Sequence, residues 1–198
     1  LEDRYGEWDE GARDRQAEPP GEWRHWLIMA GRRFGKTRTG AETVRRWAMS
    51  GRFRHVNIVG PTAADARDVM VEGESGIRAV CPPWERPSYL PSRRLLRWPN
   101  GCRSLVFTAD EPERLRGYGH QRVWGDEVAA WRYPEAWDQI QMGLSLPPDP
   151  RALWTTTPRP VRVIRDLLAD TSCVVTRGTS YENRANLTGL FYENVAKY

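Results

Sequence analysis

Residues 30–37, with the sequence AGRRFGKT, constrain the fold of this chain more than any other feature. They directly follow an apolar run, residues 26–29, and directly precede a stretch of helical character, residues 38–49. A strand, a glycine-containing loop, a Lys-Thr pair and a helix, in this order, are what a phosphate-binding loop requires. The backbone N–H groups of such a loop and the N-terminus of its helix point at the phosphates. The residues of the predicted loop are Ala30, Gly31, Arg32, Arg33, Phe34, Gly35, Lys36 and Thr37.

Two side chains of this loop have predicted roles toward a nucleotide. Lys36 is expected to reach the β- and γ-phosphates, and the Thr37 hydroxyl is expected to hold a magnesium ion. The loop departs from the strict pattern at its first position, where Ala30 replaces glycine. Alanine fits a tight turn but enters left-handed backbone conformations less readily than glycine. A glycine-containing turn with a surface lysine is the alternative that the loop alone leaves open.

Composition limits the remaining classes of protein. The chain has 198 residues, 39% of them hydrophobic and 28% charged, as expected for one globular domain. No apolar run approaches the length of a membrane span, and nothing resembles a signal peptide. The formal charge of +4 slightly favours a polyanionic partner. The three cysteines and three histidines lack the spacing of metal ligands, so no structural metal site is predicted.

The order of apolar and polar segments predicts an α/β fold. Residues 1–22 are charged and contain several Pro and Gly, which indicates an N-terminal arm. Strands alternating with helices from residue 23 onward favour a mostly parallel sheet flanked by helices. Asn100-Gly101 between two strand-like runs indicates a hairpin. The expected strands are 26–30, 55–59, 93–98, 104–108, 121–125, 152–154 and 173–176, and the expected helices are 38–49, 63–72, 134–144, 161–169 and a segment from about residue 187.

An acidic pair, Asp126-Glu127, follows one of these strands. Ligands bind outside the carboxyl ends of strands in such a sheet, and both side chains can face the ligand where the chain turns. Asp126 is expected to hold magnesium through the Thr37 hydroxyl and bound waters, and Glu127 to activate the water that attacks the γ-phosphate. The preceding run is weak because Gly125 interrupts it, and a solvated acidic turn is the alternative.

Three consecutive threonines and several arginines complete the candidate site. The hydroxyls of Thr155, Thr156 and Thr157 follow a strand and could sense a γ-phosphate, although β-branched residues also end ordinary strands. Arg114 and Arg116 are candidates for an arginine that acts on a neighbouring subunit, as in ring ATPases. Each of the two could equally belong to a solvated charge cluster. Arg32 is well placed within the loop itself.

Taken together, these segments resemble the large terminase subunits of tailed bacteriophages, from about residue 23 to the end of the chain. The resemblance rests on residues 26–42, 59–62, 109–117, 126–127, 155–158 and 178–183. It implies a P-loop NTPase of the additional-strand, catalytic-glutamate (RecA-like) type over residues 23–183. It also implies that residues 184–198 form a helix or linker toward a nuclease domain that this sequence lacks, so no nuclease activity is expected.

The function implied by the resemblance is that of a motor domain, which hydrolyses Mg-ATP and moves double-stranded DNA into a procapsid. The implied cofactors are ATP and Mg²⁺, and the implied partners are DNA, the portal protein and the small terminase subunit, with no membrane partner. The domain would form a homo-oligomeric ring when assembled and a monomer in isolation. It would act in the cytoplasm of the bacterial host, docked on the procapsid.

The resemblance also assigns roles to residues. Lys36 and Thr37 match the loop lysine and hydroxyl, and Arg32 matches a loop arginine typical of the family. Asp126 matches the magnesium-holding aspartate and Glu127 the catalytic glutamate, while Thr155 to Thr157 match the motif that couples hydrolysis to movement. Arg116 is preferred to Arg114 as the arginine finger because Gly117 follows it. The adenine contact stays open among Gln16, Trp23 and His25. The alternatives are a P-loop helicase or another nucleic-acid-dependent ATPase, and a non-catalytic nucleotide-binding or DNA-clamp module.

Overall fold

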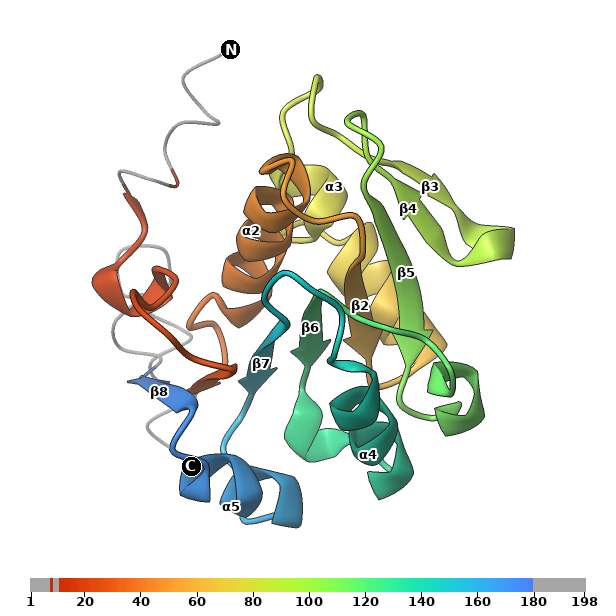
Figure 1. Ribbon diagram of the computed structural model, residues 1–198. Helices are drawn as coiled ribbons and strands as arrows, with labels where there is room; N and C mark the ends of the chain where they lie inside the picture. The colour runs from red at the N-terminus through yellow and green to blue at the C-terminus, as the bar shows by residue number, and fades with distance from the viewer. Residues whose placement is uncertain (1–7, 9–10, 180–198) are drawn as a thin grey trace.

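The centre of the molecule is a sheet of eight strands in the order β3-β4-β5-β2-β6-β7-β1-β8, within the residues that the structure describes (Figure 1). This structure is a computed structural model that describes residue 8 and residues 11–179. Neighbouring strands are parallel except β3–β4 and β4–β5, so the prediction of a mostly parallel sheet is confirmed. The strands are β1 (His25–Ala30), β2 (Val56–Gly60), β3 (Ser88–Leu90), β4 (Leu95–Arg97), β5 (Arg103–Thr108), β6 (Arg122–Asp126), β7 (Arg151–Thr156) and β8 (Cys173–Gly178).

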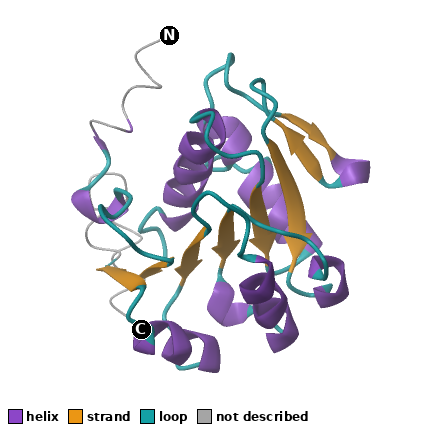
Figure 2. Cartoon of the chain, in the orientation of Figure 1, coloured by secondary structure: helices purple, strands orange, loops and turns teal. Residues whose placement is uncertain are grey.

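Helices cover both faces of the sheet (Figure 2). The α-helices are α2 (Lys36–Met49), α3 (Ile77–Val80), α4 (Pro134–Gly143) and α5 (Arg162–Ala169). The short helices are η1 (Asp14–Gln16), the π-helix η2 (Asp65–Val71), η3 (Pro91–Arg93), η4 (Pro112–Leu115) and η5 (Val128–Ala130). No helix in the described part is long and apolar enough to cross a membrane.

Alternating side chains of the strands feed two separate cores. In β1, Trp26 and Ile28 enter the core beneath α2, η2 and α3, whereas Leu27 and Met29 enter the core beneath α4 and α5. This alternation follows from the two-residue period of a strand. A strand that is apolar on both faces belongs in the middle of a covered sheet, and β1 is buried at every position.

Strand β7 lies between β1 and β6, which is the additional strand of the predicted fold class. Thr155 pairs with Ile28 on one side and with Asp126 on the other. Because all three strands are parallel, their carboxyl ends meet at one edge of the sheet. The loop after β1, the acidic pair after β6 and the threonines of β7 therefore lie together at that edge.

Two local predictions were wrong. Gly125 does not interrupt a strand, since β6 continues through it to Asp126. A Cβ at Gly125 would lie 2.5 Å from the ring of Trp154, so glycine is what lets the neighbouring strand pack there. Residues 65–71 form a π-helix rather than an α-helix. Helices of this kind occur frequently at functional sites.

Other local predictions are confirmed or lie outside the described residues. The Asn100-Gly101 turn joins β4 to β5, with Gly101 in the left-handed region at φ 89°. Residues 11–22 of the expected arm pack on the body, where Arg15 donates to the Arg177 carbonyl and Trp47 donates to Glu18. The expected helix from residue 187 lies outside the described residues, as do residues 180–183.

Replacing Gly40 by alanine is expected to destabilise the fold by about 2 kcal/mol, because its Cβ would lie 2.1 Å from the ring of Trp124. Gly40 lies in α2, and Trp124 is a fully buried residue of β6. Urea unfolding followed by circular dichroism measures the change. Gly11→Ala is the control, since nothing lies within 4 Å of the added carbon. Equal stability of the two variants would contradict the close packing of α2 on β6.

Candidate active site

The loop between β1 and α2 has the backbone that a phosphate-binding loop needs. Gly35 caps α2 in the left-handed region at φ 97°, and Arg33 also has a positive φ of 60°. Ala30 ends β1, is fully buried and pairs with Gly178. Ala30 is not among the described residues with positive φ, so the replacement of glycine at this position costs no backbone strain.

Contacts on two sides hold the loop in place. Phe34 is fully buried against Gly178, where an added Cβ would lie 2.1 Å from the Phe34 ring. On the other side, the Arg13 guanidinium lies 4.4 Å from the centre of that ring and donates to the Phe34 carbonyl. Gln16 follows in η1 and donates to the Thr39 hydroxyl in the first turn of α2 at 3.0 Å. The loop is therefore pre-formed by packing.

The Lys36 ammonium connects the carboxyl ends of three strands. It is buried, donates to the Ala30 carbonyl at 2.9 Å and donates to the Thr157 hydroxyl at 3.2 Å. It also lies 3.4 Å from a carboxylate oxygen of Glu127. A phosphate group brought to this position would compete with Glu127 for the ammonium, since both are anions of similar hydrogen-bonding geometry.

The acidic pair divides between a buried and an accessible side chain. The Asp126 carboxylate accepts a 2.6 Å hydrogen bond from Thr155 and is only 6% exposed. Burial raises the pKa of Asp126 to about 6, against the opposing effect of the Thr155 hydrogen bond. Glu127 adopts the left-handed region at φ 46°, which turns the chain directly after β6. The turn lets adjacent residues of one strand serve the same site.

Each of the three threonines contacts a different part of the acidic segment. Thr155 donates to Asp126, and the Thr156 hydroxyl accepts from the Ala129 N–H at 3.2 Å. The N–H of Thr157 donates to Glu127 at 3.0 Å, and its hydroxyl lies 3.3 Å from the other Glu127 oxygen. The end of β7 is thus cross-linked to the end of β6 and to η5, which gives the threonines a route to transmit movement.

These groups border a groove of about 1030 Å³, large enough for a nucleotide. Its walls include Arg32, Arg33, Thr37 and Glu127. They also include Arg159, which sequence reasoning missed. The available signal was the order Pro158-Arg159-Pro160 directly after the threonines, because two prolines restrict the backbone of the residue between them.

The two finger candidates do not reach this groove within one chain. Arg116 follows η4, is 67% exposed and pairs with Glu113 at 3.3 Å. Arg114 lies 3.4 Å from Glu111. Neither residue is part of the groove walls. An action of Arg116 on a phosphate therefore requires a second chain, as the prediction of a finger for a neighbouring subunit supposes.

The donor groups for a metal are few. Among the described residues, no group of three or more His, Cys, Asp or Glu side chains could hold a metal ion. The Thr37 hydroxyl and the Asp126 carboxylate are oxygen donors, which suit Mg²⁺. Mg²⁺ usually keeps several waters and is completed by substrate phosphates, so this small set fits a magnesium ion that arrives with a nucleotide.

The three candidates for the adenine contact separate clearly. Gln16 lies beside the loop and bonds to Thr39. Trp23 is buried against Trp26 at the other end of β1. His25 accepts a hydrogen bond from Trp154, and burial lowers its pKa to about 4. Only Gln16 of the three is close enough to the loop to touch a base bound there.

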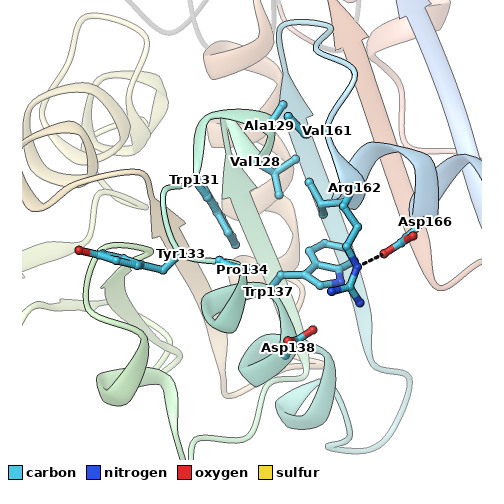
Figure 3. Close-up of a pocket in the computed structure, with 11 residues that line it drawn as sticks. Val128, Ala129, Trp131, Tyr133, Pro134, Trp137, Asp138, Val161, Arg162 and Asp166 are labelled. Atoms are coloured by element: carbon cyan, nitrogen blue, oxygen red, sulfur yellow. Dashed lines mark ion pairs between the residues drawn. The ribbon is translucent and has the colours of Figure 1, made fainter.

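A second pocket of about 120 Å³ lies between η5, α4 and α5 (Figure 3). Its walls are mostly apolar and include Trp131, Trp137 and Val161, with an Arg162–Asp166 ion pair of 3.3 Å beside them. Because a triphosphate needs several uncompensated donors, this pocket does not suit its phosphates. The groove beside Lys36 is the candidate nucleotide site.

A family comparison decides what kind of protein carries this site. Residues 27–174 match the model for the N-terminal part of the terminase large subunit, T4likevirus-type. The chain belongs to the terminase large subunit family. The match covers β1 from its third residue through α5 and the start of β8, and it includes every part of the candidate site except η1.

Solved structures of large terminases share the fold. The ATPase domain of the Thermus phage P74-26 large terminase matches with a TM-score of 0.66 and 16% identity, covering 85% of this chain and 84% of that chain. The large terminase of a second phage, described as a thermophilic bacteriophage, matches with a TM-score of 0.71 and 16% identity, over 97% of this chain and 48% of that chain. This second terminase has also been solved with ADP, at 18% identity and a TM-score of 0.69. The comparison with curated proteins gives no match.

Proposed function

We propose that this chain is the motor domain of a DNA-packaging terminase and hydrolyses Mg-ATP to move double-stranded DNA into a procapsid. The observation that carries the proposal is the contact of Lys36 with both Glu127 and Thr157, at 3.4 and 3.2 Å. It brings the loop lysine, the acidic segment and the threonines to one point at the carboxyl edge of the sheet. Family membership favours ATP as the nucleotide, and the terminase of the thermophilic bacteriophage has been solved with ADP and with ATP-gamma-S.

In this proposal the residues of the groove divide the work of hydrolysis. The loop N–H groups, Lys36 and Arg32 bind the phosphates and neutralise their charge. Glu127 accepts a proton from the attacking water and orients it. Magnesium, when bound by Thr37 and Asp126, would stabilise negative charge on the phosphate oxygens. Arg159, on the wall of the same groove, supplies a further cation from within the chain.

The threonines would report the state of the nucleotide. A phosphate that draws Lys36 away from Glu127 also changes the Thr157 contacts, because Thr157 bonds to both side chains. Thr156 holds the Ala129 N–H of η5, so the change can reach η5 and the apolar pocket behind it. We infer that this is the first step by which hydrolysis is coupled to movement.

The family further implies the setting of this motor. We propose that it assembles as a homo-oligomeric ring with the portal protein and the small terminase subunit, in the cytoplasm of the bacterial host and docked on a procapsid. The chain spans about half of the large terminase of the thermophilic bacteriophage, so these partners belong to the proposal for the whole protein. A helicase or another nucleic-acid-dependent ATPase is the alternative, and no observation on the described residues favours it.

Arg116→Ala and Arg159→Gln are expected to affect turnover differently. If Arg116 acts on a neighbouring chain, ATP turnover per chain rises with protein concentration, and Arg116→Ala removes that rise, about tenfold or more at the highest concentration. Arg159→Gln lowers turnover at every concentration, since Arg159 borders the groove of its own chain. A steady-state phosphate-release assay across protein concentrations measures both effects. A rise that persists in Arg116→Ala would contradict a finger supplied by the neighbour.

The proposed function itself is tested by the same assay with and without magnesium. Phosphate release should require ATP and stop when EDTA removes the metal. ATP that binds but is not hydrolysed at any protein concentration, with magnesium present, would favour the non-catalytic module instead.

A further inference from the structure

Two arginines face each other across the sheet at the end opposite the groove. Arg97 is the last residue of β4, Arg103 is the first residue of β5, and the two are direct antiparallel partners. Both side chains are exposed. Like charges directly opposite each other destabilise a strand pair, so this arrangement does not serve the stability of the sheet.

The two side chains lie on a part of the sheet that no described helix covers. Their neighbours in the strands, Leu96 and Ser104, are a buried pair on the other face, where Ser104 accepts a hydrogen bond from Trp98. Successive side chains of a strand alternate between faces, so Arg97 and Arg103 project from the opposite face. That position leaves both guanidinium groups open to a partner.

A third arginine extends the pair. Arg103 forms a parallel bridge with His55, and its N–H donates to the Arg54 carbonyl at 3.0 Å. Arg54 is exposed as well. The loop that carries it and the turn between β4 and β5 lie together at the top of Figure 1. We call Arg54, Arg97 and Arg103 the basic row.

The basic row differs from most surface arginines of this chain. Within the part of the chain that the structure describes, none of its three side chains forms an ion pair with a carboxylate. Elsewhere arginines are commonly paired, for example Arg94 with Glu111 at 2.9 Å and Arg78 with Glu72 at 3.4 Å. The row is thus a local concentration of uncompensated positive charge.

We propose that the basic row binds the phosphate backbone of double-stranded DNA, an inference that rests on the proposed packaging function. Guanidinium groups form paired hydrogen bonds with phosphate, and duplex DNA carries one negative charge per about 1.7 Å of axis. Proteins that bind single strands stack bases on exposed aromatic rings, and the row contains none. Because the row lies at the amino ends of β2 and β5, DNA there leaves the nucleotide groove at the carboxyl ends accessible.

The test is binding of a fluorescein-labelled DNA duplex of about 30 base pairs to the whole chain, followed by anisotropy at several salt concentrations. The variant combines Arg97→Gln with Arg103→Gln. The control combines Arg162→Gln with Arg165→Gln on α5, which removes the same charge elsewhere. The row variant should lose about tenfold or more in affinity, and its slope of log affinity against log salt should shrink by about 2, while the control keeps both values near those of the unmodified chain.

Two further readouts separate this inference from the proposed function. ATP turnover without DNA should be the same in the row variant and the unmodified chain, and thermal stability should not fall, since a repulsive pair is removed. Equal DNA affinity and equal salt slope in the row variant and the control would overturn the DNA surface while leaving the ATPase proposal intact. Tighter binding of a single-stranded oligonucleotide than of the duplex would also overturn it.

Discussion

Replacing Glu127 by glutamine is expected to lower ATP turnover by about 10²–10⁴ while ATP affinity stays close to that of the unmodified chain. The carboxylate accepts the Thr157 N–H at 3.0 Å and lies at the sharp turn after β6, where a base could meet the attacking water. Glutamine keeps the shape and much of the hydrogen bonding of glutamate but cannot accept the proton. The loss therefore falls on the chemical step.

The control for this experiment is Glu74→Gln, because Glu74 borders the same groove but does not follow a central strand. Turnover comes from a phosphate-release assay, and affinity comes from titration with a fluorescent ATP analogue. Glu74→Gln should change turnover by no more than a few fold. If Glu127→Gln hydrolyses ATP at the normal rate, Glu127 is not the base and the proposed mechanism is wrong.

Replacing Lys36 by alanine is expected to weaken ATP binding by about 10–100-fold and to reduce turnover further. Hydrogen bonds to charged groups contribute roughly 1.5–3 kcal/mol, which corresponds to that change in affinity. The variant also leaves Glu127 without its cation at 3.4 Å. Calorimetric titration with ATP measures the affinity. Unchanged affinity for the triphosphate would place the nucleotide away from the loop.

The sequence offers an internal control for Lys36. The chain contains only two lysines, Lys36 and Lys197. An amine-directed reagent followed by mass spectrometry therefore reports on both at once. Mg-ATP should slow modification of Lys36 and leave Lys197 unaffected. Equal protection of both, or of neither, would contradict a direct contact between Lys36 and the phosphates.

The parts of the fold that follow from local sequence were predictable. Residues 26–30 are apolar throughout and run into a glycine-containing loop, so both the central strand and the loop could be recognised. Asp126 and Glu127 directly follow an apolar run, which placed them at the carboxyl edge. Parallel strands then bring the chain segments after them together, wherever those segments lie in the sequence.

The parts that depend on contacts between distant residues were not predictable. Gly125 looked like an interruption because nothing local indicates that the Trp154 ring occupies its side of the sheet. The packing of residues 11–22 depends on Arg13 and Gln16 meeting the loop, which no periodic pattern announces. Arg159 follows the threonines after a proline, and its place on the groove wall depends on how β7 ends.

Arg116 shows a different limit. Its position after η4 and its 67% exposure are properties of one chain, whereas its predicted partner is the phosphate of another. A single chain cannot supply the geometry of that contact. The dependence of turnover on protein concentration is therefore the informative property for Arg116.

The most direct test of the whole account is a structure of this chain with Mg²⁺ and a non-hydrolysable ATP analogue. We expect the triphosphate in the groove, Lys36 and the loop N–H groups on its β- and γ-phosphates, Thr37 and Asp126 around the metal, and Glu127 within about 3 Å of a water in line with the γ-phosphate. A nucleotide bound in the apolar pocket beside Trp131, or a triphosphate that touches Lys36 with Glu127 directed away from it, would contradict the account.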